Sequence, residues 1–474
     1  MTELVLFNTL GRKLEPFRPL VPGEARIYTC GPTVYNEVHI GNLRTFTFQD
    51  LLRRSLRYLG YKVTQVMNLT DVDDKTILGA HKAGVSLTEY TEPFIRTFLR
   101  DLETLHVERV EHFPKATEHI PPMIRLIETL IDKGYAYVSD GSVFFSIAKD
   151  EDYGRLSGFD LDQARRGERV ASDEYGKEDV RDFVLWKAVK PDEPSWDSPW
   201  GPGRPGWHVE CSAMSMELLG ETFDLHCGGV DLIFPHHENE IAQSESATGK
   251  PFVRTWLHSE HLLVDGQKMS KSLGNQYTLP DLLGRGLSPR ALRYLFLSVH
   301  YRQKLNFTFE SLDGAAGALR RVDEMRFRLQ HAEEKAKEKG DSDPRLAESA
   351  DRLRHDFAAG LAEDLNAAVA LAALFAFVKE VNVAIEEGRI GAGDKQRVAD
   401  ALADVDQVLG VLDAAAWDTG TGEDDSAEIE RLIQERNDAR QCRDFAASDR
   451  IRGELSARGI VLEDTPQGTR WKRK

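Results

Sequence analysis

Residues 25–69 read ARIYTCGPTVYNEVHIGNLRTFTFQDLLRRSLRYLGYKVTQVMNL, and this stretch decides the fold class. Its first six residues alternate in hydrophobicity and stop at a Gly-Pro pair, as expected for a short strand. Apolar residues then recur at helical spacing over 45–59, and 62–69 is again strand-like. A strand, a helix of this length and a second strand form a βαβ unit, which predicts a parallel sheet in an α/β protein.

Three later parts of the chain do not follow this strand–helix–strand pattern. Strand-like residues at 135–138 and 142–147 flank an Asp-Gly pair, which predicts a hairpin and, around it, an insertion over 120–200. Beyond about 310 the sequence is rich in Ala, Leu, Arg and Glu, which is typical of a bundle of antiparallel helices. From 427 onward, two helical stretches and a strand-like end predict a small final unit.

The composition indicates a globular protein and narrows the functional classes. The 474 residues include 61 Lys and Arg against 78 Asp and Glu, and the net charge of −17 argues against a non-specific nucleic-acid coat protein. Four cysteines without a CxxC pair are too few for a disulfide framework and favour the cytoplasm. The longest apolar run, 367–378, is shorter than the roughly 20 residues of a membrane span, so we predict no membrane association.

Two stretches are candidates for binding phosphate. HIGN at 39–42 lies between a predicted strand and its helix, where backbone N–H groups and the positive helix end face an anion, and His39 and Asn42 add donors. KMSKS at 268–272 offers Lys268 and Lys271 beside two hydroxyls, which suits a polyphosphate that gains charge during a reaction. Taken alone, each stretch is more often a structural turn or an exposed loop.

A third group contains residues that bind zinc in many proteins. His236 and Glu240 are four residues apart and so share one helix face, and Cys211 and Cys30 are two of only four cysteines. If both thiols face one cleft, these residues provide four zinc ligands. The alternative is a pair of ordinary buried thiols, and the spacing does not decide between the two.

The first two stretches together resemble the signatures of class I aminoacyl-tRNA synthetases, with Asn42 where many members have His. The resemblance is to the cysteinyl-tRNA synthetase family, and it extends over essentially the whole chain, from FNTL at 7–10 to EDTPQGTRW at 463–471. Four further motifs carry it: CGPTVY (30–35), NLTDVDDK (68–75), GRPGWHVECS (203–212) and GGVDLIFPHHENE (228–240).

This resemblance implies a Rossmann-like parallel sheet of the class I type with an inserted domain, followed by a helical bundle and a small C-terminal α+β anticodon-binding unit. We therefore expect six segments: the first half of the catalytic domain (1–119), an inserted acceptor-end domain (120–200), the second catalytic half (201–262), the KMSKS loop and stem-contact region (263–311), the helical bundle (312–417) and the anticodon-binding unit (427–474).

The resemblance also implies a function, which is the activation of cysteine by ATP and its transfer to the 3′ end of tRNA-Cys. One zinc ion per chain would select the thiolate of cysteine over the hydroxyl of serine, held by Cys30, Cys211, His236 and Glu240. The substrate cysteine would contact Gly31, Thr70, Trp207 and His226. ATP and its Mg²⁺ would bind near His39, Asn42, Gly229, Asp231 and Lys271, and the catalytic residues would be His39, Asn42, Lys268 and Lys271.

The family further implies a monomer that binds tRNA. Candidate stem contacts are Arg290, Arg293, Arg302 and Lys304. Candidate anticodon contacts are Arg436, Asp438, Arg440, Asp449 and Trp471.

Two alternatives stay open. The chain could pass activated cysteine to a small amino-sugar acceptor, or it could be a non-catalytic tRNA- or zinc-binding relative. The unit beyond 427 argues against the first, and the presence of KMSKS together with all four candidate ligands argues against the second.

Overall fold

The computed structural model describes residues 3–158, 182–270, 273–332, 343–417, 426–442, 444–457, 460–465 and 468–473. It comprises two compact units, Met1–Asp413 and Ala414–Lys474. The predicted βαβ unit is confirmed, because α1 (Ile40–Tyr58) joins β3 (Glu24–Thr29) to β4 (Lys62–Met67), and the two strands pair in parallel.

Helix α1 begins before the region of apolar periodicity because His39 caps it. The Nδ1 atom of His39 accepts a hydrogen bond from the Asn42 backbone, and the Asn42 side chain accepts one from the His39 backbone, each at 3.2 Å. This reciprocal capping box satisfies two backbone donors of the first turn. The HIGN stretch therefore starts helix α1.

The central sheet has four parallel strands in the order β10–β9–β3–β4, which adds β9 (Phe223–Gly229) and β10 (Val253–Ser259). Strand β3 lies inside the sheet, with β4 on one side and β9 on the other, so the strand order reverses between β3 and β9. Ligands of open α/β sheets bind outside the carboxyl ends of the strands at such a switch point. Cys30 directly follows β3 at this edge.

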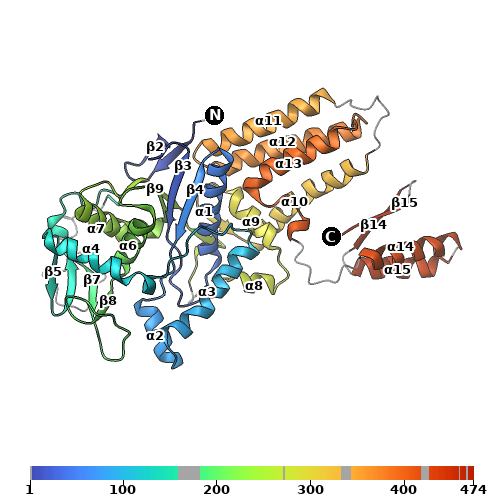
Figure 1. Cartoon of the computed structure of the whole chain (residues 1–474). Coiled ribbons are helices and arrows are strands. Elements are labelled where there is room, and N and C mark those ends of the chain that lie inside the picture. Colours follow the sequence, from blue (N-terminus) through green and yellow to red (C-terminus); the bar gives the residue numbers. More distant parts are fainter. Residues whose placement is uncertain are drawn as a thin grey trace. The chain divides into compact units, whose positions relative to one another are not determined.

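The predicted hairpin is also confirmed, and it belongs to a separate antiparallel sheet. Its strands follow one another in the order β5 (Ala136–Ser139), β6 (Ser142–Phe145), β7 (Phe183–Ala188) and β8 (Gly203–Pro205). Three helices pack on one another beside this sheet (Figure 1): α4 (Ile120–Asp132), α6 (Trp207–Leu219) and α7 (Glu238–Thr248).

Several further elements belong to the α/β part of the first unit. They are β1 (Val5–Asn8), β2 (Lys13–Pro16), α2 (Asp74–Ala83), α3 (Leu87–Thr104), β11 (Leu262–Val264), β12 (Gln267–Lys268), β13 (Leu305–Phe307), α8 (Leu279–Leu283) and α9 (Pro289–Ser298). Strands β11, β12 and β13 form a small sheet that ends at the KMSKS loop.

The predicted helical bundle is present in the same unit. Its long helices are α10 (Phe309–Gln330), α11 (Pro344–Ala362), α12 (Ala367–Glu386) and α13 (Asp394–Leu409), and the last three run side by side (Figure 1). Helix α12 contains the apolar run of 367–378 and is long and apolar enough to cross a membrane. Here it packs against α9, α10 and α11, as the core helix of a bundle does.

The second unit pairs two helices with a hairpin, namely α14 (Ser426–Gln441), α15 (Phe445–Ala457), β14 (Ile460–Thr465) and β15 (Gly468–Arg473). Its small apolar core includes Ile429, Leu455 and Ile460. Arg436 is only 3% exposed, and its guanidinium lies 3.3 Å from Thr469 Oγ1. The prediction that Arg436 reads RNA bases is therefore wrong for this conformation, because the residue packs within the unit. Asp438, Arg440 and Asp449 are exposed.

Candidate active site

The structure gathers the four predicted zinc ligands at the carboxyl edge of the central sheet. The ligand atoms of Cys30, Cys211, His236 and Glu240 all lie within 4.8 Å of one another, and all four residues are buried. Cys30 follows β3 and Cys211 lies on α6. His236 lies in the turn Ile233–His237 just before α7, and Glu240 lies in the first turn of α7. Because α6 and α7 pack on each other, Cys211 on α6 comes close to His236 and Glu240.

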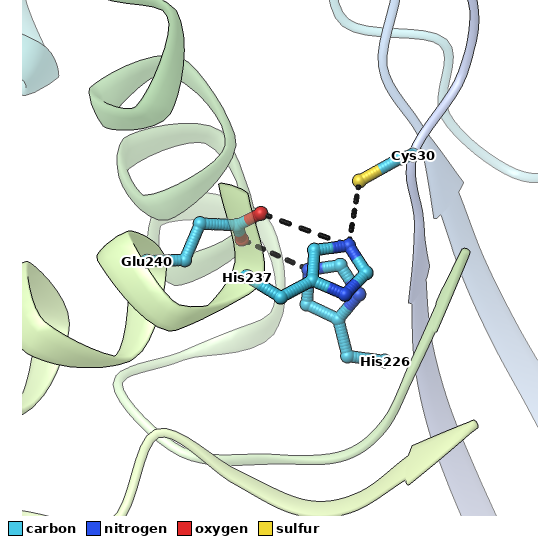
Figure 2. Close-up of side chains that lie close together, drawn as sticks. All are labelled: Cys30, His226, His237 and Glu240. Carbon is cyan, nitrogen blue, oxygen red and sulfur yellow. Dashed lines mark hydrogen bonds and ion pairs between the residues drawn. The ribbon is translucent and has the colours of Figure 1, made fainter. Parts of the chain in front are cut away.

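A second group of potential ligands shares two of these residues. His226 and His237 join Cys30 and Glu240, again within 4.8 Å (Figure 2). The His237 ring lies between Cys30 and Glu240, with its Nε2 atom 3.3 Å from Cys30 Sγ and 4.0 Å from Glu240 Oε1. His226 Nε2 lies 2.9 Å from Glu240 Oε2. His237 was not predicted as a site residue.

The hydrogen bonding of this cluster is incomplete in a way that suits a metal ion. Among the described residues, neither Glu240 Oε1 nor His226 Nδ1 has a hydrogen-bond partner, although both atoms are buried. Glu240 Oε1 does lie 3.0 Å from His236 Nε2, a contact that becomes an ion pair when His236 is protonated and that a metal ion between the two would replace. A buried polar atom without a partner costs free energy unless something else binds it. Thiolate, imidazole and carboxylate are zinc donors, so the residues fit zinc.

Two groups of the cluster are held as anions, which favours metal binding, whereas a proton on His236 competes with it. A hydrogen bond from Cys30 lowers the pKa of Cys211 to about 6 against the effect of burial. Burial raises the pKa of Glu240, but His226 and His236 outweigh it and bring that pKa to about 2. Burial lowers the pKa of His236, yet the Glu240 and Cys211 anions raise it to about 10. A metal ion that binds here must displace this proton.

Two histidines outside the ligand groups, His208 and His258, orient the candidate ligands His236 and His237. His208 Nδ1 lies 2.9 Å from His236 Nδ1, which leaves the Nε2 atom of His236 facing Glu240. His258 does the same for His237, at 2.8 Å between His258 Nε2 and His237 Nδ1. Such outer partners fix the ring orientation of a metal-binding histidine.

Three of these histidines were not predicted as site residues: His208, His237 and His258. One signal could have revealed them, because six of the fourteen histidines of the chain fall within residues 208–261.

The residues expected around substrate cysteine border this cluster. The ring of Trp207 stacks on His236 with centroids 4.2 Å apart and is 38% exposed, so it lies at the mouth of the site. His226 is fully buried and stacks on Trp256 at 4.5 Å, beneath the cluster.

Gly31 and Thr70, two of the residues expected around substrate cysteine, both form hydrogen bonds with Asn68. The backbone N–H of Gly31 donates to Asn68 Oδ1 at 3.0 Å, and Asn68 Nδ2 donates to Thr70 Oγ1 at 3.1 Å. Thr70 is buried and donates in turn to Glu210 Oε2. A Cβ atom on Gly31 would lie 1.9 Å from the Asn68 carbonyl oxygen, so this close approach requires glycine.

The two phosphate candidates lie next to each other. Ile40 N donates to Tyr277 O at 2.9 Å, and a β-bridge links His39 to Thr278, which connects the His39 turn to the segment after the KMSKS loop. Met269 lies against Gly41, where an added Cβ atom would approach the Met269 methyl group to 2.5 Å.

The charged members of this region differ in accessibility. Lys268 and Asn42 are exposed, whereas Lys271 lies outside the described residues. Burial lowers the pKa of His39, and nearby Asp231 opposes that shift. The Asp231 carboxylate folds back over Gly229 at the end of β9, where an added Cβ atom would lie 2.4 Å from Asp231 Oδ1. The edge thus combines a helix N-terminus, one exposed lysine and an acidic turn.

The cations predicted to face the tRNA stem are mostly engaged within the protein. Arg290 pairs with Asp323, and Arg302 pairs with Asp364. Arg293 is fully buried, so the prediction that it contacts tRNA is wrong. Lys304 is exposed.

Three family models match successive parts of this chain. The family of class I (C) tRNA synthetase catalytic domains matches residues 16–317, the DALR domain matches 356–413, and the cysteinyl-tRNA ligase anticodon binding domain matches 423–471. The chain belongs to the cysteinyl-tRNA synthetase family. It is accordingly an aminoacyl-tRNA synthetase, a ligase.

Similar proteins of this family match over their full length. The cysteine–tRNA ligase of Solibacter usitatus is 50% identical and covers 99% of this chain and 100% of the relative. That of Leptospira interrogans is 47% identical and covers 100% of both. Among solved structures, methionyl-tRNA synthetase of Mycobacterium tuberculosis with methionyl-adenylate has a TM-score of 0.58 at 18% identity, covering 86% of this chain and 94% of that one, and this likeness supports the class I fold.

Proposed function

We propose that the chain activates L-cysteine with ATP to cysteinyl-adenylate and transfers the cysteinyl group to the 3′ end of tRNA-Cys. The observation that carries the proposal is the convergence of Cys30, Cys211, His236 and Glu240 at the carboxyl end of β3, the strand that precedes the His39 turn and α1 in the chain. A group that can hold a thiol-selective metal, in a fold whose next turn is a candidate phosphate-binding turn, suits an enzyme that adenylates cysteine. The names of the curated relatives support the same substrate and acceptor.

The same four residues would hold one zinc ion per chain, and that ion would bind the substrate as a thiolate. A pocket that relied on shape would gain only about 1–3 kcal/mol between cysteine and serine. Sulfur coordination gives a larger preference because a hydroxyl is a poor ligand for zinc. Trp207 would border the bound cysteine, Gly31 and Thr70 would contact it, and His226 would hold Glu240 in place from below.

In the activation step, the carboxylate of cysteine would attack the α-phosphate of ATP, and pyrophosphate would leave. His39, Asn42, Lys268 and Lys271 would stabilise the charge on the phosphates, which is catalysis by positioning and electrostatics. Gly229 and Asp231 would contact the ribose of ATP. Mg²⁺ would accompany the phosphates.

The other segments would serve tRNA. We propose that 120–200 binds the acceptor end, that 263–311 approaches the stem, and that 427–474 recognises the anticodon, with catalytic halves at 1–119 and 201–262 and a bundle at 312–417. We also propose a cytoplasmic monomer. Light scattering of the purified chain tests the monomer, and a mass of twice 53.4 kDa would contradict it.

A cysteine-dependent ATP–pyrophosphate exchange assay, followed by charging of tRNA-Cys, tests the reaction. We expect both activities. Exchange without charging would instead indicate transfer to a small acceptor, and no exchange would contradict the proposed enzyme. The family match at 423–471 favours tRNA as the acceptor.

Metal analysis of Cys211→Ser tests the zinc group separately. We expect about one zinc per wild-type chain and a loss of most zinc from the variant, because a ligand contributes more than an outer partner, whose loss costs about 10- to 100-fold in affinity. Cys442→Ser is the matched control, since that cysteine is exposed and belongs to neither ligand group. Equal zinc content in Cys211→Ser and wild type would refute the assignment.

A further inference from the structure

Helix α7 carries Glu240, and the inserted segment holds this helix at both ends. At its last turn, Lys133 Nζ donates to Ala247 O at 2.5 Å, and α4 packs along the helix. At its first turn, Glu238 and Asn239 contact the loop 153–157, which follows β6 of the inserted sheet. The turn that carries a predicted zinc ligand is thus also the turn to which the inserted segment attaches.

The carboxylate of Glu238 makes the central contact. It is 1% exposed and accepts three backbone N–H groups, from Gly154 at 3.0 Å, Leu156 at 3.4 Å and Ser157 at 2.7 Å. Among the residues that the structure describes, no cation pairs with it. Backbone donors that converge on a carboxylate form an anion-binding concavity, so this loop is shaped around Glu238.

A second buried hydrogen bond also joins the loop 153–157 to the first turn of α7. The hydroxyl of Tyr153 donates to Asn239 Oδ1 at 2.6 Å, and both residues are buried. Glu238 and Glu240 are two residues apart, which corresponds to about 200° around a helix. One helical turn therefore directs one carboxylate to the loop and the other to the ligand cluster.

We propose that Glu238 is a positioning residue for the zinc group. It fixes the first turn of α7 against the loop 153–157 and thereby sets where Glu240 and His236 stand. This inference rests on the proposed function, in which Glu240 and His236 bind zinc. Loss of the carboxylate would leave three buried N–H groups without their acceptor, and the loop and the turn would separate.

Glu238→Gln tests this role because it keeps the shape and removes one acceptor oxygen. We expect zinc release to a chromogenic chelator to become about 10- to 100-fold faster, as for other outer partners of metal ligands. In ATP–pyrophosphate exchange, we expect the KM for cysteine to rise about tenfold while the KM for ATP stays within twofold. A residue that merely supported folding would not separate the two KM values.

Arg155→Ala is the matched control on the same loop. Arg155 pairs with Glu245 in a partly exposed ion pair away from the first turn, so we expect both zinc release and KM to stay within twofold of wild type. If Glu238→Gln exposes the loop 153–157 to hydrogen exchange but leaves zinc release and the KM for cysteine unchanged, the proposal is overturned.

A second variant covers the case in which Glu238→Gln does not fold. Tyr153→Phe removes only the hydrogen bond to Asn239, and we expect a smaller change in the same direction for zinc release and the KM for cysteine. No change in this folded variant would count against the proposal. If the wild-type chain binds no zinc, the zinc part of the proposed function fails. The attachment is still tested by hydrogen exchange of residues 236–242, which we expect to accelerate in Glu238→Gln.

Discussion

Two buried polar clusters of the first unit differ in how completely their atoms are bonded. In one, Arg293 of α9 donates to Asp50 Oδ2 of α1 at 2.5 Å. Its remaining guanidinium nitrogens donate to the backbone carbonyls of Leu105, His106 and Leu409. Every nitrogen of this buried guanidinium therefore has an acceptor.

Asp50 is equally well satisfied. Its Oδ2 atom also accepts from Arg54 at 2.8 Å, and its Oδ1 atom accepts from the Glu108 backbone at 2.9 Å. The second cluster, around Glu240, has two buried atoms without a hydrogen-bond partner in the described part of the chain, Glu240 Oε1 and His226 Nδ1. Burial and charge alone thus do not mark a ligand site. Incomplete bonding among groups that can bind a metal ion does.

The largest effect that we predict comes from breaking the complete cluster. Arg293→Met leaves the Asp50 carboxylate buried with Arg54 as its one side-chain partner, and removing one member of a buried ion pair costs about 3–5 kcal/mol. Urea unfolding measures the loss, and zinc analysis of the same sample should give the wild-type content. Arg290→Met, which breaks a partly exposed pair with Asp323, should cost less. If the free energy of unfolding of Arg293→Met falls by less than about 1 kcal/mol, Arg54 alone is a sufficient partner for the Asp50 carboxylate.

A pH-dependent effect of similar size is expected at Asp101 on α3, which also has a buried oxygen without a partner in the described residues but lies in neither metal group. Burial, helped by Glu37 and opposed by Arg100, raises its pKa from 3.8 to about 7. Since the unfolded residue ionises first, the folded state loses stability as pH rises from about 4 to about 7, by up to about 4 kcal/mol at 1.4 kcal/mol per pKa unit.

Asp101→Asn should remove this penalty. We expect the variant to be more stable than wild type at pH 8 and equally stable near pH 4, measured by urea unfolding at both pH values. An equal gain at both pH values would show that packing, and not ionisation, is responsible. A gain at pH 8 alone would identify Asp101 as a buried carboxylate whose incomplete hydrogen bonding is not linked to a metal group.

The sequence predicts those parts of the molecule that depend on local patterns. The parallel pairing of β3 and β4 follows from the periodicities within residues 25–69, and the β5–β6 hairpin follows from its Asp-Gly turn. The helical bundle follows from its composition. These features depend on neighbours in the chain, so a single sequence is enough.

Features that depend on tertiary packing are not predictable in this way. Cys30 and Cys211 meet because α6 packs against β3, and no spacing rule relates the two cysteines. Arg293 follows KMSKS like a surface cation, yet α1 and α13 close over it. His237 extends the ligand cluster because it neighbours His236 in a tight turn, which only the backbone reveals.

Removal of the metal should have an intermediate effect on stability. A ligand present at 100 times its Kd stabilises the folded state by about 2.7 kcal/mol, so chelation should lower the Tm of the wild-type chain. The two clusters share no residue, so we expect the same decrement in Arg293→Met. Thermal unfolding with and without chelator, in both proteins, measures it. A smaller decrement in the variant would indicate that the clusters are coupled.

The smallest effect is expected at Asp74, which resembles the Arg293 cluster in its partners but not in its burial. Asp74 accepts from Lys187 Nζ at 2.8 Å and from the Arg204 guanidinium, and its side chain is 59% exposed. Despite some burial, these two cations lower its pKa from 3.8 to about 2. A lowered pKa stabilises the folded state above about pH 4, and this contribution is lost as pH falls towards 2.

Asp74→Asn should therefore cost only about 0.2–1 kcal/mol at pH 7, because solvent screens the pair and Arg204 keeps its second partner, Glu193. The difference from wild type should shrink at pH 3, and urea unfolding at the two pH values measures both numbers. Lys62→Met, which removes a more exposed pair with Glu24, is a control that should change stability even less. A cost of 3 kcal/mol or more at pH 7 would make this half-exposed pair equivalent to Arg293 and Asp50. Solvent exposure would then not determine how much an ion pair contributes to the free energy of unfolding in this protein. Complete hydrogen bonding would remain as the property that separates structural clusters from ligand sites.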